Sequence, residues 1–352
     1  MPNPNEKDKV TPGLSDIRSE KWNDIQERQL RLKRHLWRSM VGDTIFLEAR
    51  NLAPLIGCER VYLKFEGSNP TGTQKDRIAM VLADQAVVTG SEGIATATCG
   101  NFGVAIAYAA KHYEINAHIF IPKKYDVPKD RVKRIESFGA HLYLVDGYYE
   151  DAVIHSTEIA NDNNWFNANP GTEGVTEIAI ATYSEIAVEI WRDLRRVPNY
   201  IFCPVGNGTT LSGIYSGFKK LYLTGKTMSI PKIVATSTRH GNPIIKSFKN
   251  TTRIISDLNH EEVRETKINE PLTNWRAFDG QLALDTIYES NGFADYASDA
   301  KMMEFSKLVR TEEGLSVLPA AASTLAVMES LGKEGFILKG TFVAILTGRD
   351  FD

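Results

Sequence analysis

Short apolar runs rich in β-branched residues alternate along this 352-residue chain with longer segments in which apolar residues recur every three or four positions. Runs of the first kind are typical of buried strands, and segments of the second kind are typical of amphipathic helices. The predicted strands are Val61–Phe65, Ile94–Thr98, Ala117–Ile121, His141–Val145, Tyr200–Val205, Lys232–Ser237 and Thr341–Leu346. The predicted helices are Lys75–Thr89, Phe102–Tyr113, Pro128–Phe138, Tyr149–Asp162, Thr176–Arg195, Leu211–Leu223, Gln281–Glu289, Asp299–Thr311 and Pro319–Leu331. This alternation predicts an α/β fold built from βαβ units, doubly wound and with mostly parallel sheets.

The length of the chain favours two domains, because single hydrophobic cores stop growing well below this size. No Ser/Gly-rich linker separates two halves, so we expect the chain to cross between domains more than once. An additional amphipathic helix is predicted at Leu14–Met40. It either exposes its polar face to solvent or forms an arm that contacts a second subunit.

Composition narrows the function classes. The 41 basic and 44 acidic side chains nearly balance, which argues against a general nucleic-acid binder. Three distant cysteines, Cys58, Cys99 and Cys203, predict neither a disulfide framework nor a metal site, and the polar N-terminus lacks a secretory signal, so a cytoplasmic protein is expected. Gly93–Ala110 is uncharged, but its central Gly-Asn pair favours a strand, a turn and a helix over a membrane span.

Two loops between a strand and a helix suit anion binding. Pro204–Thr210 follows a predicted strand and contains Gly206, Gly208 and two threonines, so its main-chain amides and the following helix N-terminus favour a phosphate monoester. A plain tight turn is the alternative. Thr98–Gly103 has the same placement and suits a small carboxylate, although Asn101 could equally act only as a helix cap.

A third loop, Asn69–Arg77, places Lys75 at the start of a predicted helix. A lysine there faces the positive end of the helix dipole, which disfavours its charged form. A neutral amine is the form that attacks a carbonyl carbon. The alternative is a solvated run of charged residues.

The order of these three loops resembles that of the fold-type II pyridoxal-phosphate enzymes, which include cysteine synthases, serine and threonine dehydratases and threonine synthases. Within this group, the stretch from Gly42 to Asp350 is most similar to threonine synthases. The matching segments are Gly42–Thr44, Tyr62–Gly72, Glu173-Gly174 with Glu177, Ile268-Asn269 with Pro271 and Trp275, Glu312–Gly314, Pro319–Ser323 and Thr347-Gly348. The resemblance implies a lyase of amino-acid biosynthesis that binds pyridoxal 5'-phosphate in a cleft between two domains. It implies a larger cofactor-binding domain of residues 1–56 and 176–352, and a smaller inserted domain of residues 57–175 with the lysine and carboxylate loops.

The same resemblance implies roles for the matched residues. Lys75 would bind the cofactor through a Schiff base and transfer protons, Asn101 would bond to the phenolic oxygen, and Thr347 would bond to the pyridine nitrogen. The cofactor phosphate would be held by Gly206, Asn207, Gly208, Thr209 and Thr210. The substrate would be bound by Thr98, Cys99, Gly100, Phe102 and Lys129.

Departures from the threonine synthase pattern concern the substrate. Gly171-Thr172 stand where an arginine usually follows the Asn-Pro pair, which leaves Lys129 as the expected ligand of a substrate phosphate, with Lys123, Lys124 and Arg131 as further candidates. The expected reaction converts O-phospho-L-homoserine and water to L-threonine and phosphate. The alternatives are β-elimination or β-replacement on another amino acid, as in dehydratases, cysteate synthases or cysteine synthases, and a non-catalytic cofactor-binding homologue, against which Lys75 argues. A small amino acid is the expected partner, with no nucleic acid, membrane or metal, in a homodimer.

Overall fold

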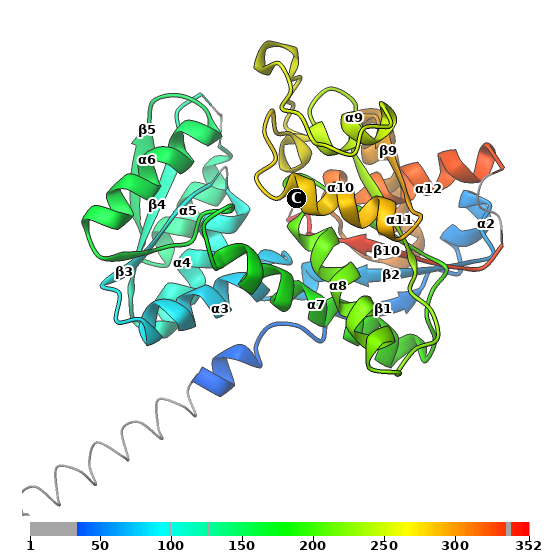
Figure 1. Ribbon diagram of the computed structural model, residues 1–352, viewed down its shortest axis with the longest axis horizontal. Helices are drawn as coiled ribbons and strands as arrows, with labels where there is room; N and C mark the ends of the chain where they lie inside the picture. The colour runs from blue at the N-terminus through cyan, green and yellow to red at the C-terminus, as the bar shows by residue number, and fades with distance from the viewer. Residues whose placement is uncertain (1–33, 99, 125–126, 336–338, 352) are drawn as a thin grey trace, which may run out of the picture. The chain divides into compact units, whose positions relative to one another are not determined.

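The computed structural model describes residues 34–98, 100–124, 127–335 and 339–351. The chain divides into two compact units, residues 1–39 and residues 40–352. In the first unit, residues 34–38 are helical (Figure 1), and most of the predicted helix Leu14–Met40 lies outside the described residues. The remainder of the fold concerns residues 40–352.

A six-stranded sheet forms one part of this unit, with the strand order β1-β2-β10-β7-β8-β9. Its strands are β1 (Ile45–Glu48), β2 (Arg60–Phe65), β10 (Thr341–Leu346), β7 (Tyr200–Pro204), β8 (Lys232–Thr238) and β9 (Phe293–Ala297). All neighbours are parallel except β1 and β2, which are antiparallel. All six residues of β10 are buried, which explains its unbroken apolar run, because helices cover both faces of a parallel sheet.

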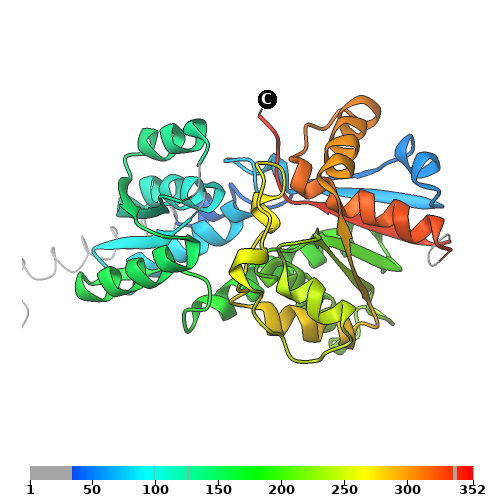
Figure 2. The ribbon, with the colours of Figure 1, turned by 90° about the horizontal axis from the view of Figure 1, so that it is seen from above.

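Two groups of helices pack against this sheet, as the view from above shows (Figure 2). The first group is α2 (Leu52–Ile56), α11 (Asp299–Glu313) and α12 (Ser323–Lys333). The second is α7 (Val175–Leu194), α8 (Thr209–Leu223), α9 (Pro243–Lys249) and α10 (Gly280–Glu289). Apolar residues of α2, α11 and α12 join those of the strands in one buried core, which fixes the sheet between the helices.

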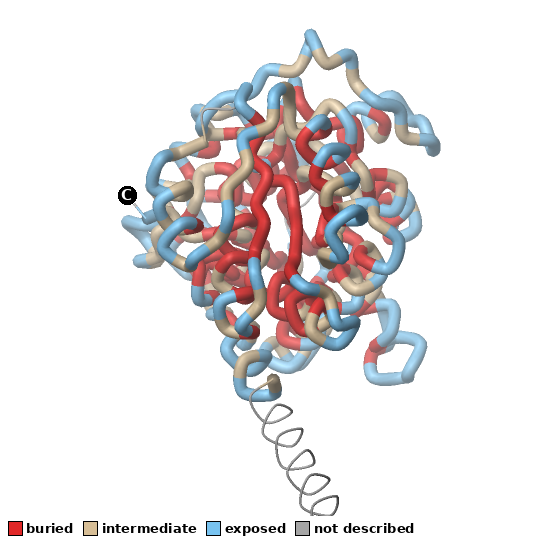
Figure 3. The backbone as a smooth tube through the Cα atoms, turned by 90° about the vertical axis from the view of Figure 1, so that its left-hand side faces the viewer, coloured by how far each residue is buried: buried red, intermediate tan, exposed pale blue. Residues whose placement is uncertain are grey.

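A four-stranded parallel sheet forms the other part, with the order β5-β4-β3-β6. Its strands are β3 (Gly93–Ala97), β4 (Asn116–Pro122), β5 (His141–Val145) and β6 (Trp165–Asn167), and its helices are α3 (Lys75–Val88), α4 (Asn101–Tyr113), α5 (Lys129–Ser137) and α6 (Tyr149–Asp162). Figure 3 shows the central strands of this sheet buried between helices. The uncharged stretch Gly93–Ala110 thus forms a buried strand and a helix, as predicted.

The predicted α/β fold with mostly parallel sheets is confirmed, and each predicted strand and each predicted helix from Lys75 onward has its counterpart. The elements that periodicity did not predict are short: β1, β6, β9, α2, α9 and three 3-10 turns, namely Glu66–Ser68, His260–Glu262 and Glu270–Leu272. Such elements contain too few residues to show a period. Within the described residues, no helix combines the length and the apolar composition that a membrane crossing requires.

One predicted domain boundary separates strands that pair in the same sheet. The boundary at residue 57 assigns β2 to the smaller domain, whereas β2 pairs with β1 and β10 in the six-stranded sheet, for example Leu63 with Ala344. In this sheet β10 lies between β2 and β7 and is hydrogen-bonded to both. The division into two domains stays a prediction.

Candidate active site

The loop before α3 is held against the end of β10, and this contact places Lys75 beside Thr347. The Gln74 N–H donates to the Thr347 carbonyl over 3.0 Å, and the Arg349 N–H donates to the Gly72 carbonyl over 2.8 Å. Gly72 has a positive φ of 93°, a conformation that a side chain disfavours. Lys75, the first residue of α3, therefore starts its helix at the carboxyl edge of the six-stranded sheet.

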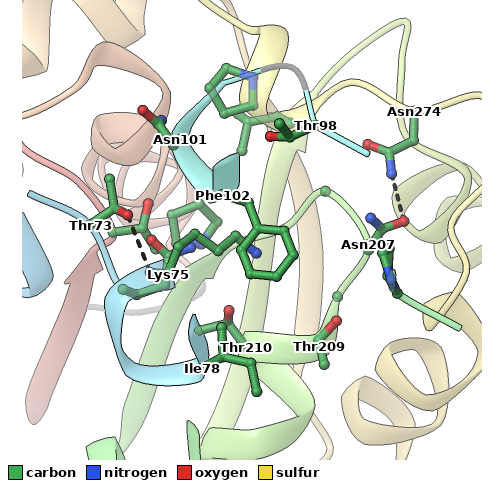
Figure 4. A pocket seen from close by; sticks show the side chains of 18 of the residues that line it. Thr73, Lys75, Ile78, Thr98, Asn101, Phe102, Asn207, Thr209, Thr210 and Asn274 are labelled. Carbon is green, nitrogen blue, oxygen red and sulfur yellow. Dashed lines mark hydrogen bonds between the residues drawn. The ribbon is translucent and has the colours of Figure 1, made fainter. Parts of the chain in front are cut away.

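The amine of Lys75 lies in a pocket among weakly polar neighbours (Figure 4). Its Nζ atom is 5.7 Å from the centre of the Phe102 ring and 6.0 Å from the centre of the Tyr183 ring. Desolvation lowers the pKa of Lys75, while the charges of Asp279 and Cys203 act in the opposite direction. Across the described ranges, Nζ makes no hydrogen bond or ion pair with another residue. The surroundings thus favour a neutral, nucleophilic amine.

The glycine-rich turn between β7 and α8 faces the same pocket. Gly208 has a positive φ of 92°, and a Cβ atom at this position would overlap the side chain of Ala283. A Cβ atom on Gly206 would lie 2.9 Å from the Pro271 carbonyl oxygen. The main-chain N–H groups of residues 206–210 donate no hydrogen bond to any other described residue. Free N–H groups at a helix start form a site for an anion.

Asp279 lies beside this turn and was not predicted from the sequence. Its carboxylate accepts hydrogen bonds from the hydroxyls of Thr209 and Thr176, the latter over 2.9 Å. Because a hydroxyl has one hydrogen, Thr209 can offer an anion its main-chain N–H but not its hydroxyl hydrogen. No sequence signal relates Asp279 to a threonine 70 residues earlier.

The loop between β3 and α4 lies on another side of Lys75. The Thr98 hydroxyl accepts hydrogen bonds from the N–H groups of Gly100 and Gly103, over 2.9 and 3.2 Å. Thr98 therefore caps the start of α4, and the Asn101 side chain makes no hydrogen bond with another described residue. The alternative role of Asn101 as a helix cap thus has no support. Cys99 lies outside the described residues.

The structure brings most of the predicted site residues into one pocket (Figure 4). Its lining includes Lys75, Thr98, Gly100, Asn101, Phe102, Gly206, Asn207, Gly208, Thr209, Thr210 and Thr347. Lys129, a predicted substrate ligand, is exposed at the first position of α5 and is not among the residues that line the pocket, so its role stays a prediction. Successive residues of a helix are about 100° apart, so Lys129 and Arg131 face different directions.

The Arg131 side chain is largely buried and forms an ion pair with Glu270. No role was predicted for Glu270 from the sequence. Arg131 Nη1 lies 3.0 Å from Glu270 Oε2, and the two side chains are 13% and 19% exposed. Arg131 also packs on Gly100, where a Cβ atom would lie 3.0 Å from Nη1. Burial raises the pKa of Glu270, and Arg131 opposes this shift. Glu270 lies within the segment Ile268–Trp275, which is one of the segments that resemble threonine synthases. The sequence therefore identified this segment, but it did not identify Arg131 as the partner of Glu270.

Metal binding has no geometric support in the described ranges, where no three His, Cys, Asp or Glu side chains are grouped so that they could hold an ion.

Comparisons with known proteins agree with this geometry. Residues 38–348 match the family described as pyridoxal-phosphate dependent enzymes. The chain is 28% identical over 309 residues to the threonine synthase of Methanocaldococcus jannaschii, covering 87% of this chain and 74% of that protein. It is 29% identical over 311 residues to the threonine synthase of Methanosarcina acetivorans, again covering 87% and 74%.

Solved structures show the same fold at lower identity. Threonine deaminase isoform 2 of Solanum lycopersicum superimposes with a TM-score of 0.73 at 18% identity, covering 92% of this chain and 89% of that chain. Maize serine racemase superimposes with a TM-score of 0.72 at 21% identity, covering 92% and 93%. These enzymes share the fold-type II architecture. The chain belongs to the family of pyridoxal-phosphate dependent enzymes, and its cofactor is pyridoxal 5'-phosphate.

Proposed function

We propose that this protein is a lyase that removes or replaces the side-chain substituent of a small L-amino acid. The first candidate reaction is that of threonine synthases, the conversion of O-phospho-L-homoserine and water to L-threonine and phosphate. The threonine synthase relatives, which each cover most of this chain, support it. The proposal rests on the arrangement of the pocket. The surroundings of Lys75 favour the neutral form of its amine, and the glycine-rich turn presents main-chain N–H groups without hydrogen-bond partners to the same pocket.

The residues present fit pyridoxal phosphate. Lys75 would hold it covalently, and the unbonded N–H groups of residues 206–210 match the oxygens of one phosphate monoester. Thr347 and Asn101 line the same pocket and would orient the ring. Thr209 would contribute its N–H, since its hydroxyl hydrogen is bonded to Asp279.

The protein residues would then handle substrate and protons. Bound pyridoxal phosphate supplies an electron sink that eases loss of a proton from the substrate carbon next to the amine. The Lys75 amine would accept that proton and return it, because its lowered pKa leaves a usable neutral fraction. The N-terminus of α4, with Gly100 and Phe102, would bind the substrate carboxylate.

A second candidate is elimination or replacement on an amino acid without a phosphate. The predicted phosphate ligand Lys129 lies outside the pocket, and Arg131 is paired with Glu270. A phosphate on the substrate requires a set of cationic donors in addition to those that bind the cofactor.

Two experiments test the proposal. The purified Lys75→Ala variant is expected to lose the near-visible absorption of the bound cofactor, whereas the Lys129→Ala control, which changes an exposed lysine, keeps it. If the Lys75→Ala variant retains this absorption, Lys75 is not the lysine that binds the cofactor.

The second experiment offers the native enzyme O-phospho-L-homoserine, O-phospho-L-serine, O-acetyl-L-serine and L-threonine in turn, and measures products by chromatography. Threonine and phosphate from the first compound would support the threonine synthase reaction. Turnover of the last two only would support the second candidate. No product from any of the four, with sulfide or sulfite also supplied as an incoming nucleophile, would contradict both.

A further inference from the structure

We propose that Glu270, held in place by Arg131, makes the substrate side-chain subsite of this pocket selective for amino acids whose departing group carries no negative charge. The inference rests on the proposed function, since it assumes that the pocket receives an amino acid. It deepens that function by choosing between the two classes of substrate.

The charges that line the pocket are the first argument. Of the lining residues that the structure describes, Lys75 is the cation, and Glu265, Glu270 and Asp279 are acids. The cofactor phosphate adds further negative charge at the glycine-rich turn. A substrate phosphate would therefore enter a pocket whose described lining offers it no cation besides Lys75, and the nearby carboxylate of Asp279 and the cofactor phosphate would repel it.

The second argument is that the nearest further cation is already occupied. Arg131 donates to Glu270 over 3.0 Å, and its side chain is largely enclosed between Glu270 and Gly100. A phosphate bound to Arg131 would lie beside the Glu270 carboxylate. Displacing that carboxylate would leave it desolvated and without its partner, which is costly.

The third argument is that Glu270 has little freedom to leave. The Glu270 N–H donates to the Thr266 carbonyl over 3.0 Å, and the Thr273 N–H donates to the Glu270 carbonyl over 3.1 Å. The next residue, Pro271, places its carbonyl where a Cβ atom on Gly206 would collide. The main chain of the turn that carries Glu270 is therefore packed against the proposed cofactor site, and the hydrogen bond from Arg131 holds the carboxylate in the pocket wall.

These relationships favour a neutral substituent, such as a hydroxyl or an acetyl ester. A neutral group needs no cation and leaves the Arg131–Glu270 pair intact. It would also experience no repulsion from Glu265 or Asp279. Gly171 and Thr172, which follow the lining residue Pro170, are uncharged and supply no compensating cation.

Binding of two unreactive amino acids to the cofactor-loaded enzyme tests the inference. L-norvaline and L-2-amino-4-phosphonobutyrate have chains of similar length that end in a methyl group and in a phosphonate, and neither has a bond that the enzyme would break. Dissociation constants are measured by calorimetry and by the change in cofactor absorption. We expect norvaline to bind at least about tenfold more tightly to the native enzyme.

The Glu270→Gln variant, which removes the charge and nearly preserves shape, tests the residue. Its dissociation constant for the phosphonate should fall by about tenfold or more, with that for norvaline changed by less than about threefold. The control is Glu262→Gln, an exposed glutamate in a neighbouring turn, which should change neither. Circular dichroism checks that each variant is folded. The comparison of norvaline with the phosphonate on the native enzyme does not depend on any variant.

The outcomes separate the inference from the function on which it rests. If the phosphonate binds the native enzyme as tightly as norvaline or more tightly, the selectivity is wrong and the proposed function survives. An unchanged ligand preference in Glu270→Gln would also overturn the role of Glu270. If neither amino acid binds the cofactor-loaded enzyme, the proposed function itself fails.

Discussion

Arg77 Nη1 donates a hydrogen bond to Glu189 Oε1 over 2.6 Å and so ties α3, two residues beyond Lys75, to α7. Both side chains are buried, and Arg77 also pairs with Glu66 over 2.6 Å, while Lys64 pairs with Glu189 over 2.5 Å. Two cations and two anions thus balance in a dry cluster. The cluster fixes the first turn of the helix that carries Lys75.

Removing Arg77 should destabilise the fold strongly, because two buried carboxylates would lose their main partner. For Arg77→Ala we expect a loss of about 3–5 kcal/mol in the free energy of unfolding. Urea denaturation of the cofactor-free protein measures it. Arg50→Ala is the control, since that side chain is 82% exposed in its pair with Glu48, and it should cost less than about 1 kcal/mol. Equal losses in the two variants would contradict a structural role for the cluster.

The same cluster predicts acid sensitivity. Burial by itself raises the pKa of Glu189, but the hydrogen bond and charge of Arg77, together with Lys64, lower it to about 2 from 4.5. A depressed pKa means that the stabilisation is complete above the unfolded value and is lost as the pH falls through the folded one. The window is therefore from about pH 4.5 down to about pH 2, and the contribution is about 3 kcal/mol.

Comparison with Glu189→Gln isolates this contribution. Unfolding free energies measured between about pH 6 and about pH 3 should fall less steeply for the variant than for the native protein. Asp76, whose pKa burial raises to about 6, acts with the opposite sign but is present in both proteins. Parallel pH profiles would show that Glu189 keeps an ordinary pKa.

The amine of Lys75 should titrate below an exposed lysine. In the cofactor-free protein, pH-dependent acetylation followed by mass spectrometry compares Lys75, whose pKa desolvation lowers, with Lys219, whose pKa is raised by its hydrogen bond to Glu289. Asp279→Asn should lower the Lys75 value further, because that carboxylate stabilises the charged amine. A Lys75 profile that coincides with that of Lys219, or one that rises in the variant, would contradict this electrostatic picture.

Adding a methyl group to the glycine-rich turn should damage both stability and cofactor binding. Gly208→Ala combines a positive φ with overlap onto Ala283, so we expect a loss of about 2–4 kcal/mol. Gly225→Ala is the matched control: its φ is also positive, at 72°, but nothing lies within 4 Å of the added Cβ, so strain of about 1–2 kcal/mol remains. Urea denaturation measures the stability of each variant, and titration with the cofactor measures its affinity. An equal loss of cofactor affinity in Gly208→Ala and Gly225→Ala would disprove a local role for Gly208.

Sequence patterns predicted the order of strands and helices because periodicity is a local property. The loops that carry Lys75, Asn101 and Gly206–Thr210 each follow a buried strand in the sequence. In parallel sheets such loops meet at one edge. This rule brings together the loops after β2 and β7 of the six-stranded sheet, whereas the Asn101 loop follows β3 of the four-stranded sheet and reaches the same pocket only through the tertiary structure. The edge strands β1 and β9, with four and five residues, were not predicted because pairing with a neighbour, rather than periodicity, defines them.

What the sequence by itself determined is thus the α/β alternation, the family resemblance and the loops that line the pocket. Only the tertiary structure decided which charges meet. In the folded chain, Arg131 donates a hydrogen bond to Glu270, 139 residues away in the sequence, and the Thr209 hydroxyl donates one to Asp279, 70 residues away. Lys129 is exposed to solvent. Contacts between residues far apart in the chain depend on how helices and sheets pack and on the rotation of each helix about its axis, and a linear pattern does not specify either. The Arg131–Glu270 wall of the pocket is built from such contacts, whereas the glycine-rich turn is built from consecutive residues.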